Sequence, residues 1–135
     1  MREQLVEFKF GSIKPESLNI SPDNYRPTRE GFNLGFDLSA SDNIRIIWAY
    51  LEGLLELASK FQLNHPGLLI FDEPKQQEAK AVSFRNLLVR AGGALSRKQQ
   101  VLFLTSEPLA NLEVLTQNIP TKITRVDGWV FKRIS

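Results

Sequence analysis

Apolar positions along the chain predict most of its helices. Residues 42–61 are apolar at almost every position outside one narrow polar stripe that includes Arg45 and Glu52, so we expect a long helix there, the most buried in the domain. Apolar residues recur at helical spacing over residues 79–91, which are followed by Gly-Gly, and a short helix is expected over residues 109–116.

Two short apolar runs predict strands. The run at residues 68–71 is preceded by His-Pro-Gly and followed by Asp-Glu-Pro, and a second run covers residues 101–105. Continuous apolar runs of this length are typical of parallel strands that are buried on both faces. Because a predicted helix separates the two runs, we expect a right-handed parallel crossover, with both strands delivering polar residues to the same edge of the sheet.

The two ends of the chain predict β structure as well. Residues 5–10 and 13–20 have the pattern of a strand, a turn and a second strand or extended segment, and residues 21–31 have the composition of a surface loop. Residues 122–126 and 129–134 are expected to pair as a hairpin across Asp-Gly. The whole pattern predicts an α/β fold with a partial parallel sheet, flanking helices, an N-terminal β segment and a C-terminal hairpin.

Composition narrows the class of protein. A chain of 135 residues suits one domain, and 42% hydrophobic with 24% charged residues is ordinary for a globular protein. The sequence has no Cys and one His, which excludes disulfides and thiolate metal sites and disfavours a histidine-based metal centre. It has no apolar run long enough to span a bilayer and no signal peptide, so we expect a soluble, cytoplasmic protein without a membrane partner.

Charge is unevenly distributed. From Arg90 onward there are seven basic residues against three acidic ones. Nucleic-acid binding is one interpretation of this excess, and a solvated basic face is the favoured one.

Asp72 and Glu73 follow directly after the first predicted strand. In open α/β sheets ligands bind outside the carboxyl ends of the strands, so this pair is aimed at the functional edge. A nucleotide hydrolase needs one acid to hold Mg²⁺ through its water shell and another to orient or deprotonate the attacking water. An acidic turn that merely ends a core strand is the alternative interpretation.

Ser39 and Ser41 precede the long helix. First-turn N–H groups and the helix dipole favour a phosphate oxygen, and two hydroxyl groups would add donors. Asp42 opposes this interpretation because its carboxylate can cap the same N–H groups. Simple helix capping is therefore the favoured role when the segment is considered alone.

These pieces, in this order, resemble the C-terminal part of the nucleotide-binding head of ABC-type ATPases, most closely the SMC-like and RecF/RecN-like DNA-repair branch. Residues 38–42, Leu-Ser-Ala-Ser-Asp, are similar to the signature motif. Residues 68–73 resemble Walker B with its catalytic Glu, and Pro74 also matches. Residues 75–78 take the position of the D-loop, and the strand that ends at Thr105-Ser106 takes that of the switch. The resemblance covers residues 34–108.

The resemblance implies a role for each matching residue. Ser39, with Ser41, would bind the γ-phosphate of an ATP held by an opposing head. Asp72 would hold the water shell of Mg²⁺, and Glu73 would polarise the attacking water as the catalytic residue. The D-loop residues Gln76 or Gln77 would communicate between two sites, and Thr105 or Ser106 would contact phosphate at the switch. The sequence departs from the pattern at the signature glycines, at the D-loop Leu-Asp and at the switch His.

The chain lacks one part of such a site. No segment fits G-x-x-x-x-G-K-[ST], the loop that cradles nucleotide phosphates. We therefore expect a P-loop-bearing N-terminal half or partner chain, a homo- or heterodimer, and ATP with Mg²⁺ only in the composite site. DNA is a further candidate partner, in repair or defence. A non-hydrolysing interaction module and a free-standing Mg²⁺-dependent phosphoesterase are the alternatives. Without the missing half, the strand at residues 101–105 should have an unpaired edge that can pair with a strand of another chain.

Overall fold

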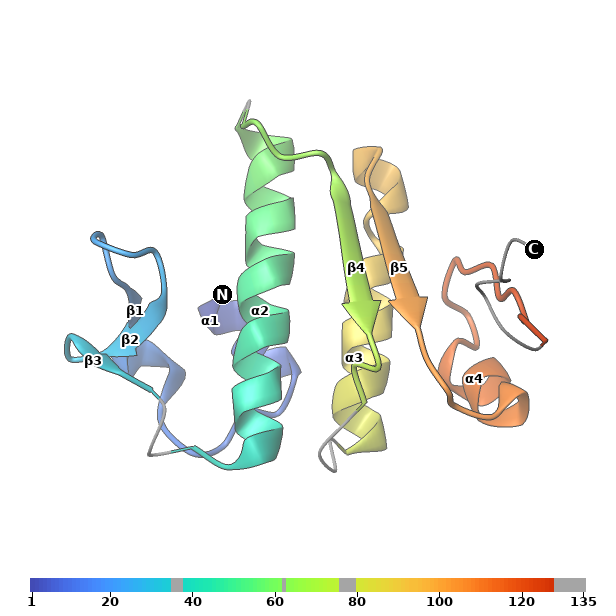
Figure 1. Ribbon diagram of the computed structural model, residues 1–135, viewed down its shortest axis with the longest axis horizontal. Helices are drawn as coiled ribbons and strands as arrows, with labels where there is room; N and C mark the ends of the chain where they lie inside the picture. Colours follow the sequence, from blue (N-terminus) through green and yellow to red (C-terminus); the bar gives the residue numbers. More distant parts are fainter. Residues whose placement is uncertain (35–37, 62, 76–79, 128–135) are drawn as a thin grey trace, which may run out of the picture.

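The computed structural model describes residues 1–34, 38–61, 63–75 and 80–127. Helix α2 separates an N-terminal part, with a small antiparallel sheet, from a C-terminal part with a parallel strand pair (Figure 1). The elements in chain order are α1 (Arg2–Glu7), the 3₁₀ turn η1 (Pro15–Ser17), β1 (Leu18–Ile20), β2 (Pro27–Arg29), β3 (Phe32–Asn33), α2 (Ala40–Lys60), β4 (Leu68–Asp72), α3 (Ala81–Gly92), the 3₁₀ turn η2 (Leu95–Arg97), β5 (Gln100–Leu104) and α4 (Leu109–Leu115).

The predicted parallel crossover is confirmed. Strands β4 and β5 pair in parallel from Leu68↔Gln100 to Asp72↔Leu104, and α3 connects them behind the pair in the view of Figure 1. The helices α2, α3 and α4 lie within two residues of the predicted bounds at each end. The protein is thus a mixed α/β structure, with a two-stranded parallel sheet.

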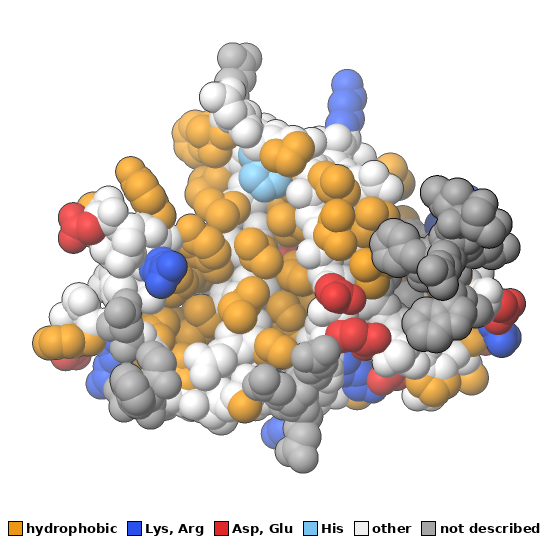
Figure 2. All heavy atoms as spheres, viewed as in Figure 1, with side chains coloured by type: hydrophobic (Ala, Val, Ile, Leu, Met, Phe, Trp, Pro, Cys, Tyr) orange, Lys and Arg blue, Asp and Glu red, His pale blue; other side chains and the backbone are white. Residues whose placement is uncertain are grey.

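The prediction that these strands are buried on both faces is wrong. Leu69 and Phe71 are buried, whereas their neighbours Ile70 and Leu104, on the opposite face, are 55% and 54% exposed. Figure 2 shows hydrophobic side chains gathered on this face, over β4 and β5 and continuing over α2. The apolar run at residues 68–71 therefore correctly predicted a parallel strand. Such strands are normally covered on both faces of the sheet, but the described residues cover only one face.

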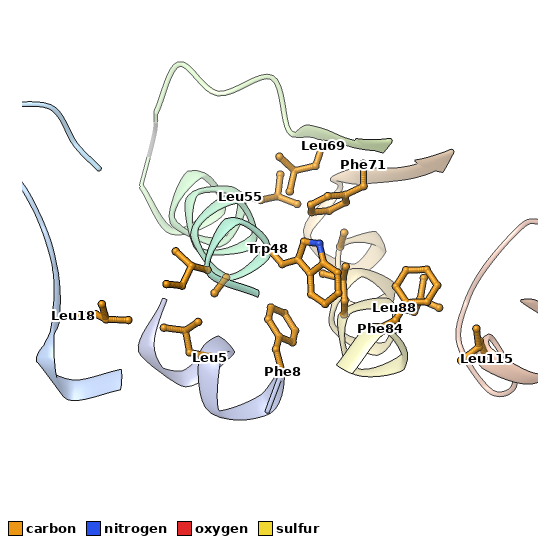
Figure 3. Packing of buried hydrophobic residues seen from close by; sticks show 14 residues of the cluster. Leu5, Phe8, Leu18, Trp48, Leu55, Leu69, Phe71, Phe84, Leu88 and Leu115 are labelled. Carbon is orange, nitrogen blue, oxygen red and sulfur yellow. The ribbon is translucent and has the colours of Figure 1, made fainter. Parts of the chain in front are cut away.

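The buried face is held by a chain of aromatic contacts (Figure 3). Trp48 of α2 lies between Phe8, at a ring-centroid distance of 6.0 Å, and Phe84 of α3, at 6.4 Å. Phe84 meets Phe103 of β5 edge to face at 6.2 Å, and Phe103 stacks on Phe71 of β4 at 5.2 Å. These contacts join the N-terminal segment, two helices and the sheet into one core.

The first two residues of the polar stripe of α2 face the interior. Arg45 and Glu52 are 4% and 0% exposed, while the apolar Ile47 and Leu57 of the same helix are 54% and 44% exposed. Arg45 stays buried because the side chains of Asp42, Ser83 and Ser41 accept its hydrogen bonds. The helix is long and largely buried, as predicted, but the described residues leave part of its apolar surface uncovered.

Helix α1 replaces the first predicted strand. Leu5 and Phe8 lie three residues apart and are both fully buried, which is helical spacing, and Val6 between them is exposed. The second predicted segment, residues 13–20, is strand only over its last three residues, which form β1, and it contains the 3₁₀ turn η1. The predicted loop over residues 21–31 contains β2, which pairs with both β1 and β3.

The predicted C-terminal hairpin is not found in its described arm. Residues 122–126 form no helix or strand, and residues 129–134 lie outside the described residues.

Glu52 generates a testable prediction about stability. Burial raises the pKa of this carboxyl to about 7 although the charges of Arg97 and Arg90 oppose the shift, and neither carboxylate oxygen has a hydrogen-bond partner. The folded state therefore retains a proton that the unfolded chain loses near its ordinary pKa of 4.5, so stability falls as pH rises from 4.5 towards 7. Above about pH 7, ionisation of Glu52 lowers the free energy of unfolding by at most about 3 kcal/mol. We expect Glu52→Gln to raise the thermal midpoint at about pH 8 and to change it little at about pH 4. Equal destabilisation at both pH values would contradict this account.

Candidate functional site

The sequence-predicted site residues that the structure describes lie at one edge of the molecule. Strands β4 and β5 end, and helices α2 and α3 begin, at the lower edge in Figure 1. This is the edge at which parallel α/β sheets collect ligands. The two groups of candidates, the acids after β4 and the serines before α2, share no hydrogen bond with each other among the described residues.

The second residue of the acidic pair, Glu73, is held by β5 and the residues that follow it. Asp72 is exposed at the end of β4, and Glu73 follows it with a backbone φ of 43°. The Glu73 N–H donates to the carbonyl of Leu104 at 2.8 Å, and the Ser106 hydroxyl donates to Oε2 of Glu73 at 3.1 Å. A non-glycine residue with positive φ is uncommon and carries strain, which functional sites often contain. The structure thus brings the predicted catalytic residue and a predicted switch residue into direct contact.

An ion pair closes the same edge. Lys75 forms a salt bridge with Glu107, and its hydrogen bond is the main reason why the pKa of Glu107 lies below the usual value. Thr105 accepts a hydrogen bond from the N–H of Glu107 at 3.2 Å. Thr105 therefore shapes the turn after β5, whereas Ser106 is the switch candidate that reaches the acids.

The serines form a polar pocket of about 450 Å³ at the start of α2. Ser39 is the N-cap, and its hydroxyl oxygen accepts from the N–H of Asp42 at 3.2 Å, so the capping interpretation is confirmed. The Ser39 and Ser41 hydroxyls lie 3.2 Å apart. Ser39 is exposed rather than packed in the core.

Asp42 does not compete for this helix start, contrary to expectation. Its carboxylate instead accepts from the N–H groups of Gly11 and Ser12, from the Ser12 hydroxyl at 2.6 Å, and from Arg45. Burial by itself raises the pKa of Asp42, but the hydrogen bonds from Ser12, Arg45 and Gly11 outweigh it and hold the pKa below the usual value. The carboxylate therefore ties the segment after α1 to α2 and leaves the serine hydroxyls accessible.

Basic residues at the serine pocket were missed by sequence reasoning. Lys9 and Lys80 line the pocket together with Arg45. Lys9 comes from the segment that was predicted to be a strand, and Lys80 is separated from the serines by about forty residues of sequence. No local pattern marks either as a neighbour of Ser39, and only the fold brings them together.

Two further observations concern the candidate residues. Gln76 and Gln77, the predicted D-loop residues, lie outside the described residues. Within the described part of the chain, no group of three or more His, Cys, Asp and Glu side chains is placed to hold a metal ion.

Comparisons with known protein families, with curated proteins and with solved structures found no match to this chain. Among the described residues, no helix combines the length and the apolar character needed to cross a membrane.

The Asp42 contacts predict a pH-dependent contribution to stability. Because the folded-state pKa is lowered, the ionised carboxylate stabilises the protein above the ordinary pKa of 3.8, and this contribution is lost as pH falls through the lower folded-state pKa. We expect Asp42→Asn to cost about 3 kcal/mol near neutral pH, because it leaves the buried Arg45 without its counter-charge. Chemical denaturation measures the loss, and Asp23→Asn in an exposed loop is the matched control. An equal effect of the two substitutions near neutral pH would contradict the account.

Proposed function

We propose that this chain is the signature- and Walker B-bearing half of an SMC-like ABC-type ATPase, and that it acts in a composite dimeric head. The observation that supports it most is the contact between Ser106 and Glu73 at the carboxyl end of a parallel strand pair. The contact joins the two strand ends at which the sequence resemblance places the catalytic Glu and the switch.

The acidic edge fits a Mg²⁺-nucleotide. Asp72 is exposed and free to hold the ion through its water shell, while Glu73, fixed by the Leu104 carbonyl and Ser106, is held in one orientation. A fixed carboxylate beside a phosphate can accept the proton of an attacking water. Mg²⁺ would supply charge neutralisation of the phosphates when bound.

The serine pocket fits the phosphate of a nucleotide held by an opposing subunit. The Ser39 and Ser41 hydroxyls share one hydrogen bond, so one of their two O–H groups remains to donate to a ligand, and Lys9 and Lys80 add positive charge. Because Asp42 is neutralised by Arg45, it does not repel an anion at this helix start. The pocket and the acids belong to different half-sites in this proposal, so a single chain does not need to bring them into contact.

A non-hydrolysing interaction module is the second candidate. It is favoured by the departures from the motif, Ala40 and Ser41 in place of glycines and no His at the switch, together with the exposed apolar face of β4 and β5. In that case the same edge binds a partner without turnover. The proposed setting, DNA repair or defence in the cytoplasm, follows from the resemblance for either candidate.

The experiment that separates the candidates is reconstituted ATP hydrolysis. The chain is mixed with a candidate P-loop-bearing protein, and phosphate release is measured with and without each component. We expect hydrolysis only from the mixture, and a loss of about 10²- to 10⁴-fold for Glu73→Gln, because the substitution removes the proton acceptor and leaves the fold intact.

The matched control is Glu113→Gln, which changes an exposed carboxylate on α4. It should leave the rate unchanged, and Glu73→Gln should retain nucleotide-dependent association of the two proteins. Turnover that survives Glu73→Gln would refute the catalytic role. Association without any turnover of the unaltered pair would favour the interaction module.

A further inference from the structure

Strand β5 is paired on one side only. The Gln100 N–H donates to the Gly67 carbonyl and the Leu104 carbonyl accepts from Glu73, both at 2.8 Å, so the backbone groups of these alternating residues face β4. The backbone groups of the residues between them face the opposite edge. No strand among the described residues pairs with that edge, which confirms the predicted open edge, and a groove of about 1070 Å³ lined by β5, α3, α4 and residues 120–126 runs beside it.

The side chain of Gln99 ties the start of β5 to α2. Its Nε2 donates to the Leu55 carbonyl at 2.6 Å, and its Oε1 accepts from Nε of Arg97 at 2.9 Å. Because a Gln amide has one donor end and one acceptor end, the bond from Arg97 fixes the end that points to α2. Arg97 thereby orients the contact between α2 and the residue that precedes β5.

Arg97 has a second possible acceptor in Glu52. Nη2 of Arg97 is buried without a hydrogen-bond partner, and so are both carboxylate oxygens of Glu52. Glu52 and Leu55 lie three residues apart on α2 and therefore share one side of the helix. Of the charges that act on Glu52, that of Arg97 has the largest effect. An unpaired guanidinium N–H and an unpaired carboxyl in one buried region are complementary.

Arg90, the other cation that acts on Glu52, already has acidic partners. Its two terminal nitrogens pair with Glu56 of α2 at 2.5 Å and with Glu7 of α1 at 2.7 Å. Glu56 in turn raises the pKa of Glu52, although less than burial does. Arg97 has no acidic partner among the described residues, so it is the cation that an ionised Glu52 can recruit.

Two more titratable groups lie near this cluster. The Met1 amino group lies against the residue that follows Glu52 on α2, and burial is the main reason why its pKa is lowered. On the side of β4, Nδ1 of His65 accepts from the N–H of Gly67 at 3.1 Å. A measurement of pH dependence must separate both groups from Glu52.

We propose that Glu52, Arg97 and Gln99 form a proton-sensitive exchange, in which loss of the Glu52 proton transfers Arg97 from the Gln99 amide to the Glu52 carboxylate. The transfer leaves the Gln99 amide without its orienting bond and loosens the contact between α2 and the start of β5.

The strengths of the two hydrogen bonds set the direction of the exchange. A protonated Glu52 is neutral and does not attract Arg97, which then stays with Gln99. A hydrogen bond between a guanidinium and a carboxylate is roughly twice as strong as one between neutral groups, so ionised Glu52 outcompetes the amide. Burial raises the pKa of Glu52 to about 7, which places the exchange near neutral pH. The proton passes to solvent, and only hydrogen bonds change.

The exchange acts on the end of β5 that lies away from the candidate site. Gln100 and Val101 begin this strand and line the groove, whereas Asp72 and Glu73 lie at the opposite end of the strand pair. Ionisation of Glu52 therefore changes how firmly one end of the groove is held against α2 and alters no contact of the acids. The proposal is independent of the proposed ATPase.

An NMR titration of the free chain from about pH 5 to about pH 9 tests the exchange. The carboxyl carbon of Glu52 reports its ionisation, Nε of Arg97 reports the partner of the guanidinium, and Nε2 of Gln99 reports the amide. We expect the three signals to change with one midpoint. In Glu52→Gln the Arg97 and Gln99 signals should stay constant. Changes that persist in this variant would belong to the Met1 amino group or His65 and would overturn the proposal.

Two substitutions should move the Glu52 midpoint in opposite directions. Gln99→Met removes the competing acceptor and should lower the midpoint by about 0.5 to 1 pH unit, which is about a three- to tenfold change in proton affinity. Arg97→Met removes the recruited cation and should raise the midpoint. Glu113→Gln on α4 is the matched control and should leave it unchanged.

A static cluster gives a different result. If Arg97 stays with Gln99 at every pH, Gln99→Met leaves the Glu52 midpoint unchanged or raises it, and either outcome would overturn the exchange. Circular dichroism checks that each variant is folded. Glu52→Gln and Gln99→Met decide the matter even if Arg97→Met fails to fold, because both replace a side chain by one of similar volume.

Discussion

The packing of Trp48 between Phe8 and Phe84 is the interaction on which the structure depends. It joins the N-terminal helix to α2 and α3, and through Phe103 and Phe71 it extends to both strands of the parallel pair. All of these contacts lie on one face of the sheet. The protein therefore has a well-packed core and, on the opposite side of the same strands, an apolar surface that faces solvent.

The packing of the helices on one face of the strand pair also positions the candidate site. Fixing α2 and α3 against the strand pair places two helix starts and two strand ends at one edge. Buried polar contacts reinforce the arrangement, since Arg45 hydrogen-bonds both Asp42 in α2 and Ser83 in α3. The edge thus carries Glu73, held by the backbone of β5 and by Ser106, and a separate pocket of hydroxyl and basic groups. In the proposed function, these two groups are half-sites that a neighbouring subunit would complete.

The sequence predicted the C-terminal half of the fold well because its helices and strands are separated by clear breakers and have unambiguous periods. It misassigned the first segment, since Leu5 and Phe8 fit a helix as well as an irregular strand. It also missed that Arg45 and Glu52 are buried, because their surroundings come from distant parts of the chain. The apolar run at residues 68–71 correctly indicated a parallel strand, but the predicted burial on both faces was wrong, because the described residues cover only one face of it. The predicted parallel strands already placed Glu73 and Ser106 at the same edge of the sheet. No local sequence pattern indicates that Lys9 and Lys80 lie beside Ser39.

The central claim is that the parallel sheet of this chain is unfinished at β5. Amide hydrogen exchange of the free chain, followed residue by residue by NMR, tests it most directly. The account predicts slow exchange at Leu102 and Leu104, whose N–H groups face β4, and fast exchange at Val101 and Phe103, whose N–H groups face the groove. Uniformly slow exchange along β5 in the free chain would contradict it, because that edge would then already be paired.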